Sequence, residues 1–408
     1  MMIAALKESE PGETRVAVTP VSAALLVARG LEVRVEAGAG AAAGFEDRAY
    51  EQKGAKVLSD RQALRDGADV LLRVRATLTD PADRDGLRRG QVIIGLADPL
   101  GAPEAARELA EQGVTLFALE LLPRISRAQG MDALSSMATV TGYRAVLQAA
   151  IELPRMFPLL MTAAGTVPPA RVLVIGAGVA GLQAIATARR LGAVVKAYDI
   201  RPAARNEVES LGATFLELPL ETEDAEGAGG YACAMDEAFY KRQRELLSEV
   251  LGEIDVVITL AAVPGQKAPI LITGEMTRRL RPGSVIVDLA APFGGNCELT
   301  KPDEVVHTEG ITILGPTNLP AMVPHDASLM YSRNLATFLL HLTDKEGALK
   351  LDLDDPITRE TLVARDGELV HPRVRQALGL EESPHSTTTA TTTTATTEPT
   401  PPPSSGDH

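Results

Sequence analysis

Residues Arg171 to Asp199 read RVLVIGAGVAGLQAIATARRLGAVVKAYD. The stretch joins an apolar run rich in β-branched residues, a Gly-x-Gly-x-x-Gly turn, a helical segment and a second apolar run that ends on an acid. Gly176 permits a tight turn, Gly178 close approach of the backbone to a pyrophosphate, and Gly181 close packing of helix on sheet. The phosphates would meet the positive end of the helix. This order predicts a dinucleotide site, and the alternative is a structural turn of the same shape without a ligand.

The acid that ends the stretch indicates which dinucleotide binds. Asp199 lies about twenty residues beyond the glycines, where a carboxylate accepts hydrogen bonds from the ribose hydroxyls and repels a 2′-phosphate. Arg201 is a contrary signal, because a nearby arginine can accommodate a 2′-phosphate. We give Asp199 more weight and predict NAD(H). The expected contacts are Gly176, Gly178, Val179, Ala180, Gly181, Asp199, Ile200 and Arg201.

Composition limits the class of protein. The 408 residues are 45% hydrophobic and carry a formal charge of −14, which suits a soluble enzyme of two domains. Nucleic acid or an anionic membrane surface would demand a basic face, so neither is an expected partner. Cys233 and Cys297 have neither metal-ligand spacing nor the density of a disulfide framework. We therefore expect no metal site and a reducing compartment.

No segment reads as a membrane anchor. The first residues, MMIAALKESEPGETR, have acids where a signal peptide needs an apolar core. The apolar-rich runs at 156–170 and 172–188 are interrupted by prolines or glycines and are shorter than a spanning helix requires. We expect the chain not to insert into a bilayer.

The chain reads as α/β, with two Rossmann-like domains whose parallel sheets flank a nucleotide cleft. Residues 1–135 alternate short strands and helices and form the first domain, which residues from about 327 to 380 complete. A helix from Ser135 to about Phe157 links the lobes, and a helix at 331–342 returns. The strands expected in the first domain are 3–6, 31–36, 70–74, 92–95 and 115–118.

Residues 136–326 are the expected NAD(H)-binding domain. After the glycine turn its strands are 194–199, 256–260, 285–289 and 311–314. Ligands of such sheets sit beyond the carboxyl ends of the strands, which places 261–265, Asp288 and Asn318 near the cofactor, with Ala262 and Leu289 as contacts. Ordinary turn chemistry is an equal alternative for each of these residues.

Two segments read as loops or tails. Residues 221–231, ETEDAEGAGGY, are acidic and glycine-rich, and predict a mobile surface loop. Tyr231 at its end could act as a lid, or could simply anchor the loop. Residues 383–408 are rich in Thr and Pro and predict a disordered tail without chemistry.

The six histidines all lie at residue 307 or beyond. Oxidation of an alcohol or amine needs a proton acceptor near the substrate carbon, and histidine is the usual one. His325 is the single candidate near the cleft, and a surface histidine is the favoured alternative. Hydride transfer between two nicotinamides moves no proton at the reacting carbons and needs only positioning. Hydride transfer between two nicotinamides therefore fits the positions of the histidines better than oxidation of an alcohol or amine does.

Between the lobes the chain reads PRISRAQGMD at 123–132, followed by ALSS. This segment, hereafter the 123–132 loop, resembles the corresponding loop in the NAD(H)-binding component of proton-translocating NAD(P) transhydrogenases. The resemblance runs from about residue 1 to 375 and includes KESEPGETRVAVTP at 7–20, GGYA at 229–232, PGSVIVDLA at 282–290 and GGNC at 294–297.

The resemblance implies site residues and partners. Arg124, Gln129 and Asp132 would hold the dihydronicotinamide and meet a nucleotide on the partner, with Arg127 and Ser135 in the same shell. Gly230 and Tyr231 would close over NAD(H). NADP(H) would be bound by a separate subunit, and a membrane-spanning subunit would couple hydride transfer to proton translocation. The resemblance further implies a homodimer that is cytoplasmic and peripheral on the inner face of the plasma membrane through its partners.

Two rival functions remain. Alanine dehydrogenase shares the two-lobed fold, and Arg15 matches its carboxylate-binding position. However, the dehydrogenase pattern has a Lys where this chain reads LRVR at 72–75 and a His where it reads GLAD at 95–98. Arg15 could instead pair an acid, which is the favoured alternative. A non-catalytic NAD-sensing module is the second rival.

Overall fold

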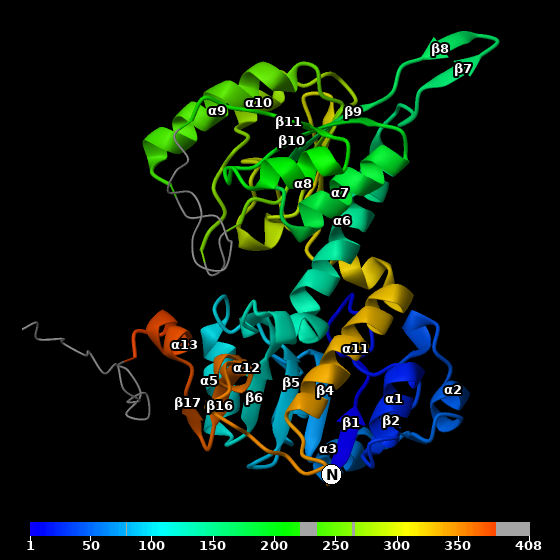
Figure 1. The fold of residues 1–408 in the computed structure, drawn as a ribbon, viewed down its shortest axis with the longest axis vertical. Helices are drawn as coiled ribbons and strands as arrows, with labels where there is room; N and C mark the ends of the chain where they lie inside the picture. Colours follow the sequence, from blue (N-terminus) through cyan, green and yellow to red (C-terminus); the bar gives the residue numbers. More distant parts are fainter. Residues whose placement is uncertain (79, 221–234, 263–265, 381–408) are drawn as a thin grey trace, which may run out of the picture.

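The computed structural model describes residues 1–78, 80–220, 235–262 and 266–380. Two α/β lobes are joined by two long helices, α6 (Ala133–Glu152) and α11 (Pro324–His341) (Figure 1). The predicted fold class is confirmed. The predictions about Gly230, Tyr231, Cys233 and the Thr/Pro-rich tail concern residues outside the described ranges.

The first lobe is built on an eight-stranded sheet of order β17-β16-β6-β5-β4-β1-β2-β3. Strands lie at all five predicted places, and β3 and the C-terminal pair β16 and β17 were not predicted. The chain returns after α11 to add β16 antiparallel to β6. The strands are β1 (Met2–Ala5), β2 (Glu32–Glu36), β3 (Lys56–Leu58), β4 (Val70–Arg75), β5 (Val92–Leu96), β6 (Thr115–Ala118), β16 (Leu362–Arg365) and β17 (Glu368–Leu369).

Helices cover this sheet because its central strands are buried along their whole length and need apolar cover on both faces. The α-helices of the lobe are α1 (Pro20–Val27), α2 (Asp47–Glu51), α3 (Arg61–Gly67), α4 (Pro81–Arg84), α5 (Pro103–Glu111), α12 (Pro356–Thr361) and α13 (Pro372–Ala377). Three short 3-10 helices, η1 (Ala41–Ala43), η2 (Leu119–Leu121) and η3 (Ser126–Met131), shape its loops.

The second lobe holds a seven-stranded sheet of order β11-β10-β9-β12-β13-β15-β14. The order reverses at β9, because β10 pairs on one side and β12 on the other, and ligands of open sheets sit at such a point. The strands are β9 (Arg171–Ile175), β10 (Val194–Tyr198), β11 (Thr214–Phe215), β12 (Val256–Thr259), β13 (Val285–Asp288), β14 (Val305–Thr308) and β15 (Ile311–Leu314). Its helices are α7 (Val179–Arg190), α8 (Ala204–Ser210), α9 (Glu237–Leu251), α10 (Gly274–Thr277), η5 (Ala291–Phe293) and η6 (Leu319–Met322).

Helix α6 belongs to both cores. Met137 and Val140 pack in the core of the first lobe, whereas Val146 and Ala149 pack in the core of the second. The helix was expected to run to about Phe157 and ends at Glu152, because the residue before Pro154 is driven to an extended conformation.

A two-stranded hairpin, β7 (Leu160–Thr162) and β8 (Gly165–Val167), follows α6 and was not predicted. It projects away from the body of the second lobe (Figure 1). Met161 on this hairpin is 82% exposed.

Candidate functional site

The glycine turn lies between β9 and α7. Gly176 has a φ of 105°, which other residues rarely adopt. A Cβ at Gly181 would lie 2.0 Å from the carbonyl oxygen of Gly176, so only glycine allows the helix to start so close to the strand. A Cβ at Gly178 would meet nothing within 4 Å. Open space therefore lies where a pyrophosphate would approach.

The first turn of α7 is free to receive an anion. Its N-cap is Gly178, and no side chain of the described residues caps it. The amide groups of such a turn point toward a ligand, and the helix dipole favours negative charge there. Val179 is exposed and Ala180 is partly exposed at this end of the helix.

Asp199 and Arg201 form one unit at the end of β10. The Asp199 carboxylate accepts hydrogen bonds from the backbone N–H of Ala177 at 2.7 Å and of Arg201 at 2.9 Å. The Arg201 guanidinium donates to both carboxylate oxygens at 3.0 Å. Ile200 between them is partly buried. The two residues that gave opposing signals for the choice of dinucleotide are thus paired with each other, and any ligand hydroxyl that approached Asp199 would compete with Arg201.

The end of β13 holds a buried carboxylate. Asp288 is fully buried and accepts hydrogen bonds from three backbone N–H groups and from the hydroxyls of Thr259 and Thr300. One of those amides belongs to Asn296, whose side chain bonds the backbone N–H and C=O of Ala261. Asp288 therefore orders the loops at this edge of the sheet. Ala262 and Leu289, expected as cofactor contacts, are partly exposed.

Asn318 joins the lobes. Its amide donates to Glu13 at 3.1 Å, and its carbonyl accepts from Arg15 at 3.3 Å. Arg15 is buried and donates to both oxygens of Glu13. Burial alone would raise the pKa of Glu13, but hydrogen bonds and charge from Arg15 outweigh it and lower that pKa. Arg15 thus forms an ion pair with Glu13, which is the structural role that was favoured over binding of a substrate carboxylate.

The 123–132 loop leads directly into α6. Arg124 and Gln129 are exposed. Asp132 caps α6, because its carboxylate accepts from the Ser135 backbone N–H at 2.8 Å and from the Ser135 hydroxyl at 2.6 Å. Arg127 instead reaches Asp355, at 2.7 and 2.8 Å. Of these predicted site residues, Asp132 and Ser135 therefore contact each other, whereas Arg127 contacts Asp355.

Helix α6 also contacts α7, the helix that follows the glycine turn. A Cβ at Gly142 would lie 2.0 Å from the carbonyl oxygen of Ala180 in the first turn of α7. Gly142 is ten residues beyond Asp132, which is roughly 15 Å along a helix axis. One rigid element thus links the 123–132 loop to the predicted phosphate site.

Glu120 is a titratable group that the sequence analysis missed. It follows β6, and burial raises its pKa to about 7. Its neighbour Asp98 has a φ of 42° and donates its backbone N–H to Glu120 at 2.8 Å. An acid two residues after a buried strand is the signal that could have indicated it.

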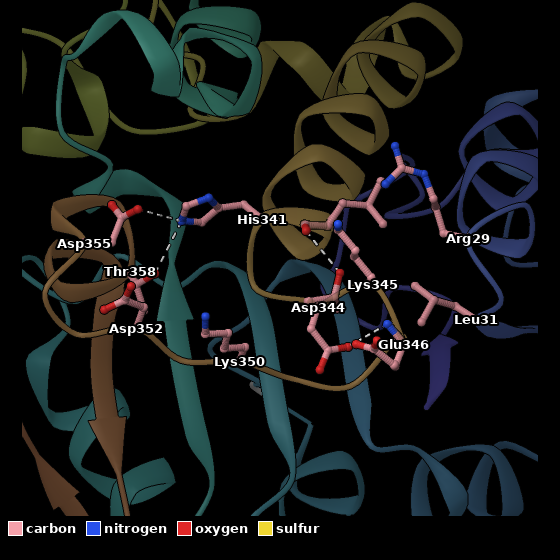
Figure 2. Close-up of a pocket in the computed structure, with 13 residues that line it drawn as sticks. Arg29, Leu31, His341, Asp344, Lys345, Glu346, Lys350, Asp352, Asp355 and Thr358 are labelled. Atoms are coloured by element: carbon pink, nitrogen blue, oxygen red, sulfur yellow. Dashed lines mark hydrogen bonds and ion pairs between the residues drawn. The ribbon is translucent and has the colours of Figure 1, made fainter.

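A separate pocket of about 480 Å³ lies in the first lobe (Figure 2). Charged side chains from the end of α11 and the segment before α12 line it, including His341, Lys350 and Asp355. Its lining residues all belong to the first lobe, so it is not the site at the glycine turn. His325 lies at the other end of α11, exposed, with its ring stacked on Phe45.

Metal-binding clusters and membrane-spanning helices are both absent from the described ranges. No group of three or more His, Cys, Asp or Glu side chains is arranged there to hold a metal ion. No helix there has the length and apolar character needed to span a bilayer.

A three-glycine turn before an uncapped helix, at the switch point of a parallel sheet, defines a dinucleotide-binding protein of two Rossmann-like lobes. Family models of the alanine dehydrogenase/PNT N-terminal and C-terminal domains match residues 4–141 and 145–372. The chain belongs to the alanine dehydrogenase/PNT family, and the resemblance found in the sequence is confirmed.

Relatives from both branches of the family match nearly the whole chain. An NAD(P) transhydrogenase alpha-subunit polypeptide of Rhodospirillum rubrum is 47% identical over 377 residues, 91% of this chain and 98% of the relative. The solved transhydrogenase structure from Sinorhizobium meliloti has a TM-score of 0.81 at 44% identity, covering 91% and 100% of the two chains. Alanine dehydrogenase of Halomonas elongata is 32% identical over 389 residues, 93% and 98% of the two chains.

Proposed function

We propose that this chain is the NAD(H)-binding subunit of a proton-translocating NAD(P) transhydrogenase. NADH bound here donates hydride directly to NADP⁺ on a partner subunit, and a membrane-spanning subunit couples that step to proton translocation. The observation that carries the proposal is the exposure of Arg124 and Gln129 on a loop fixed to α6, the helix that also contacts the nucleotide turn. Such a loop can present a nicotinamide ring to a second protein.

Different groups of residues bind different parts of the cofactor. Gly176, Gly178 and the first turn of α7 seat the pyrophosphate, and Asp199 binds the adenosine ribose. Arg124, Gln129 and Asp132 orient the dihydronicotinamide. The bound cofactor supplies the hydride, so the protein has only to align two rings and exclude water. Gly230 and Tyr231, outside the described residues, would close over the cofactor.

The chemistry at the first lobe counts against the amino-acid dehydrogenase alternative. Where that activity needs a lysine and a histidine, this chain has Arg73, Arg75 and Asp98. Arg73 is buried and donates to Glu8 at 3.2 Å and to Asp83 at 3.4 Å. A guanidinium held in this way cannot exchange a proton near neutral pH. The two positions that carry the lysine and the histidine in the dehydrogenase pattern therefore supply neither group in this chain.

The surface supports association with a second copy of the chain. Ile151, Leu159 and Met161 are 68%, 54% and 82% exposed, and they cluster in the sequence at the end of α6 and the start of the projecting hairpin. An isolated two-stranded hairpin is marginally stable in water, and exposed apolar patches mark association sites. We propose a homodimer that uses this region and sits on the cytoplasmic face of the membrane through its partner subunits.

Reconstitution with the NADP(H)-binding partner tests the function. We expect the purified chain to bind NADH more tightly than NADPH, to be inert alone, and to reduce an NADP⁺ analogue once the partner is added. Turnover of alanine with NAD⁺ by the chain alone would favour the dehydrogenase. NADH binding without transfer in the complete complex would favour the sensing module.

Variants of the 123–132 loop sharpen this test. Gln129→Ala and Asp132→Asn should slow transfer by about tenfold or more while NADH affinity changes little, since they act on ring alignment. The Asp132→Asn variant keeps a side-chain oxygen that can accept from the Ser135 backbone N–H, so the N-cap of α6 is preserved. Gln52→Ala, at an exposed glutamine after α2, is the matched control. Equal loss of affinity and rate would mean that the loop is only a binding element.

A further inference from the structure

Arg127 makes a two-pronged contact far along the chain. Its Nη1 lies 2.7 Å from Asp355 Oδ2, and its Nη2 lies 2.8 Å from Asp355 Oδ1. The carboxylate is mostly buried, whereas the guanidinium is largely exposed. Hydrogen bonds from Arg127 lower the pKa of Asp355. Paired, parallel bonds of this kind fix the orientation of both groups as well as their distance.

Asp355 is itself firmly placed. Its Oδ1 accepts from the backbone N–H of Ile357 at 2.8 Å, so it caps α12. Its Oδ2 lies 3.6 Å from Nε2 of His341 at the end of α11, and Figure 2 shows these two side chains turned toward each other. Arg127 therefore binds to a fixed point built by the C-terminal part of the first lobe.

A second contact holds the same segment from α11. The Asn334 side chain, 8% exposed, donates to the carbonyl oxygen of Gly130 at 3.0 Å. Ala128 and Met131 are buried in the core of the first lobe. The segment η3 is thus attached on its inner side at several points, while Gln129 stays exposed between Arg127 and Gly130.

A short 3-10 helix has little stability of its own, because its hydrogen-bond geometry is poor. The conformation of η3 must therefore come from its attachments. Gln129 lies within η3, and Arg124 lies two residues before it. Whatever holds η3 also sets how these two side chains are presented.

We propose that Arg127 is a positioning residue, and that its ion pair with Asp355 fixes the 123–132 loop in the conformation that presents Arg124 and Gln129 to the nicotinamide. In this role Arg127 does not contact the nucleotide. The inference rests on the proposed function for its effect on hydride transfer, whereas the ordering of η3 stands independently of that function.

Single and double variants test the pair. Arg127→Ala removes the guanidinium, and Asp355→Asn removes the charge while keeping an N-cap for α12. Arg359→Ala is the control, because it removes another exposed arginine, paired with the adjacent Glu360, from α12 itself. Three quantities are measured: amide hydrogen exchange at 126–131, the Kd for NADH, and the hydride-transfer rate with the NADP(H)-binding partner.

We expect both single variants to speed exchange at 126–131 and to slow transfer by about tenfold, with the Kd for NADH within about threefold of the parent value. The double variant should be no slower than the slower single variant, because both changes remove the same pair. The control should match the parent.

Two outcomes overturn the proposal. Weaker NADH binding in Arg127→Ala but not in Asp355→Asn would make Arg127 a nucleotide ligand. Unchanged exchange at 126–131 in both variants would show that the pair does not order the loop. If the parent chain supports no transfer with its partner, the proposed function fails, and the exchange measurement alone decides the role of the pair.

Discussion

Gly142 of α6 faces Ala180 of α7 so closely that a Cβ on Gly142 would lie 2.0 Å from the Ala180 carbonyl oxygen. This approach places α6, which begins at the end of the 123–132 loop, against the first turn of α7. The contact therefore couples the two halves of the proposed cofactor site.

Gly142→Ala should destabilise the second lobe by about 1 to 3 kcal/mol, because the added methyl group must push α6 away from α7. The urea midpoint of unfolding measures the loss. Gly252→Ala is the control, since a Cβ there would have its nearest neighbour at 3.7 Å, and its stability should stay within about 0.5 kcal/mol of the parent. Equal midpoints for the two variants would show that α6 can shift freely.

Gly178 and Gly181 of the turn should respond differently to substitution by alanine. In Gly178→Ala the added Cβ would have no neighbour within 4 Å, and the backbone φ of −75° is one that alanine readily adopts. The fold should therefore be unaffected. The methyl group would occupy the approach of the pyrophosphate, and we expect NADH affinity to fall by about tenfold or more. Gly181→Ala should lower both stability and affinity, because its Cβ would lie 2.0 Å from the Gly176 carbonyl oxygen. Fluorescence titration with NADH and thermal unfolding separate the two effects. Undiminished affinity in Gly178→Ala would place the pyrophosphate elsewhere.

Arg201 should weaken the preference for NADH over NADPH. It donates hydrogen bonds to Asp199, the proposed acceptor for the ribose hydroxyls, and it would supply a positive charge for a 2′-phosphate. Arg201→Ala should therefore raise the ratio of the Kd for NADPH to the Kd for NADH, and Asp199→Asn should lower it, each by about tenfold. Arg205→Ala is the control, because Arg205 lies on α8 and is paired with Glu217. A ratio that Arg201→Ala leaves unchanged would mean that the arginine has no part in cofactor choice.

Local patterns predicted five of the seven strands of the second lobe's sheet and helix α7, whereas β11, β14 and the helices α8, α9 and α10 were not predicted. The strand β9, the glycine turn and α7 were predicted from one continuous stretch of sequence. In each of its three parts the residues favour the conformation that the part adopts. The buried strands on either side were found because each is an apolar run between turn residues. Helix α11 was expected to begin at Tyr331 and begins at Pro324, because a proline fits the first turn of a helix, where its missing N–H has no partner to lose.

Contacts between distant residues could not be predicted in the same way. Strand β16 pairs with β6 across more than two hundred residues, and nothing in either segment specifies the partner. The same holds for Arg127 with Asp355 and for Arg15 and Asn318 across the two lobes. Asp288 was correctly placed at the carboxyl end of its strand, but its hydrogen bonds show a role in ordering loops, which depends on where the chain returns.

Glu120 combines burial with an incomplete set of hydrogen bonds. Its Oε1 accepts from the backbone N–H of Asp98 at 2.8 Å, whereas its Oε2 is enclosed and has no hydrogen-bond partner in the described part of the chain. A carboxylate in that setting loses hydration that nothing replaces. The neutral acid is therefore favoured in the folded chain.

The pKa of Glu120 predicts how stability changes with pH. Burial raises it to about 7 from an ordinary value of 4.5. Between these values the unfolded chain loses the proton and the folded chain keeps it, so the contribution of Glu120 to the unfolding free energy falls as pH rises and is constant above about 7. Glu120→Gln is neutral at every pH and should stabilise the chain at pH 8, by at most about 3 kcal/mol, and far less at pH 5. Urea midpoints at the two pH values measure the difference, with Glu51→Gln, at an exposed glutamate of α2, as the control. A gain of the same size at both pH values would show that Glu120 is already ionised at pH 5 in the folded chain.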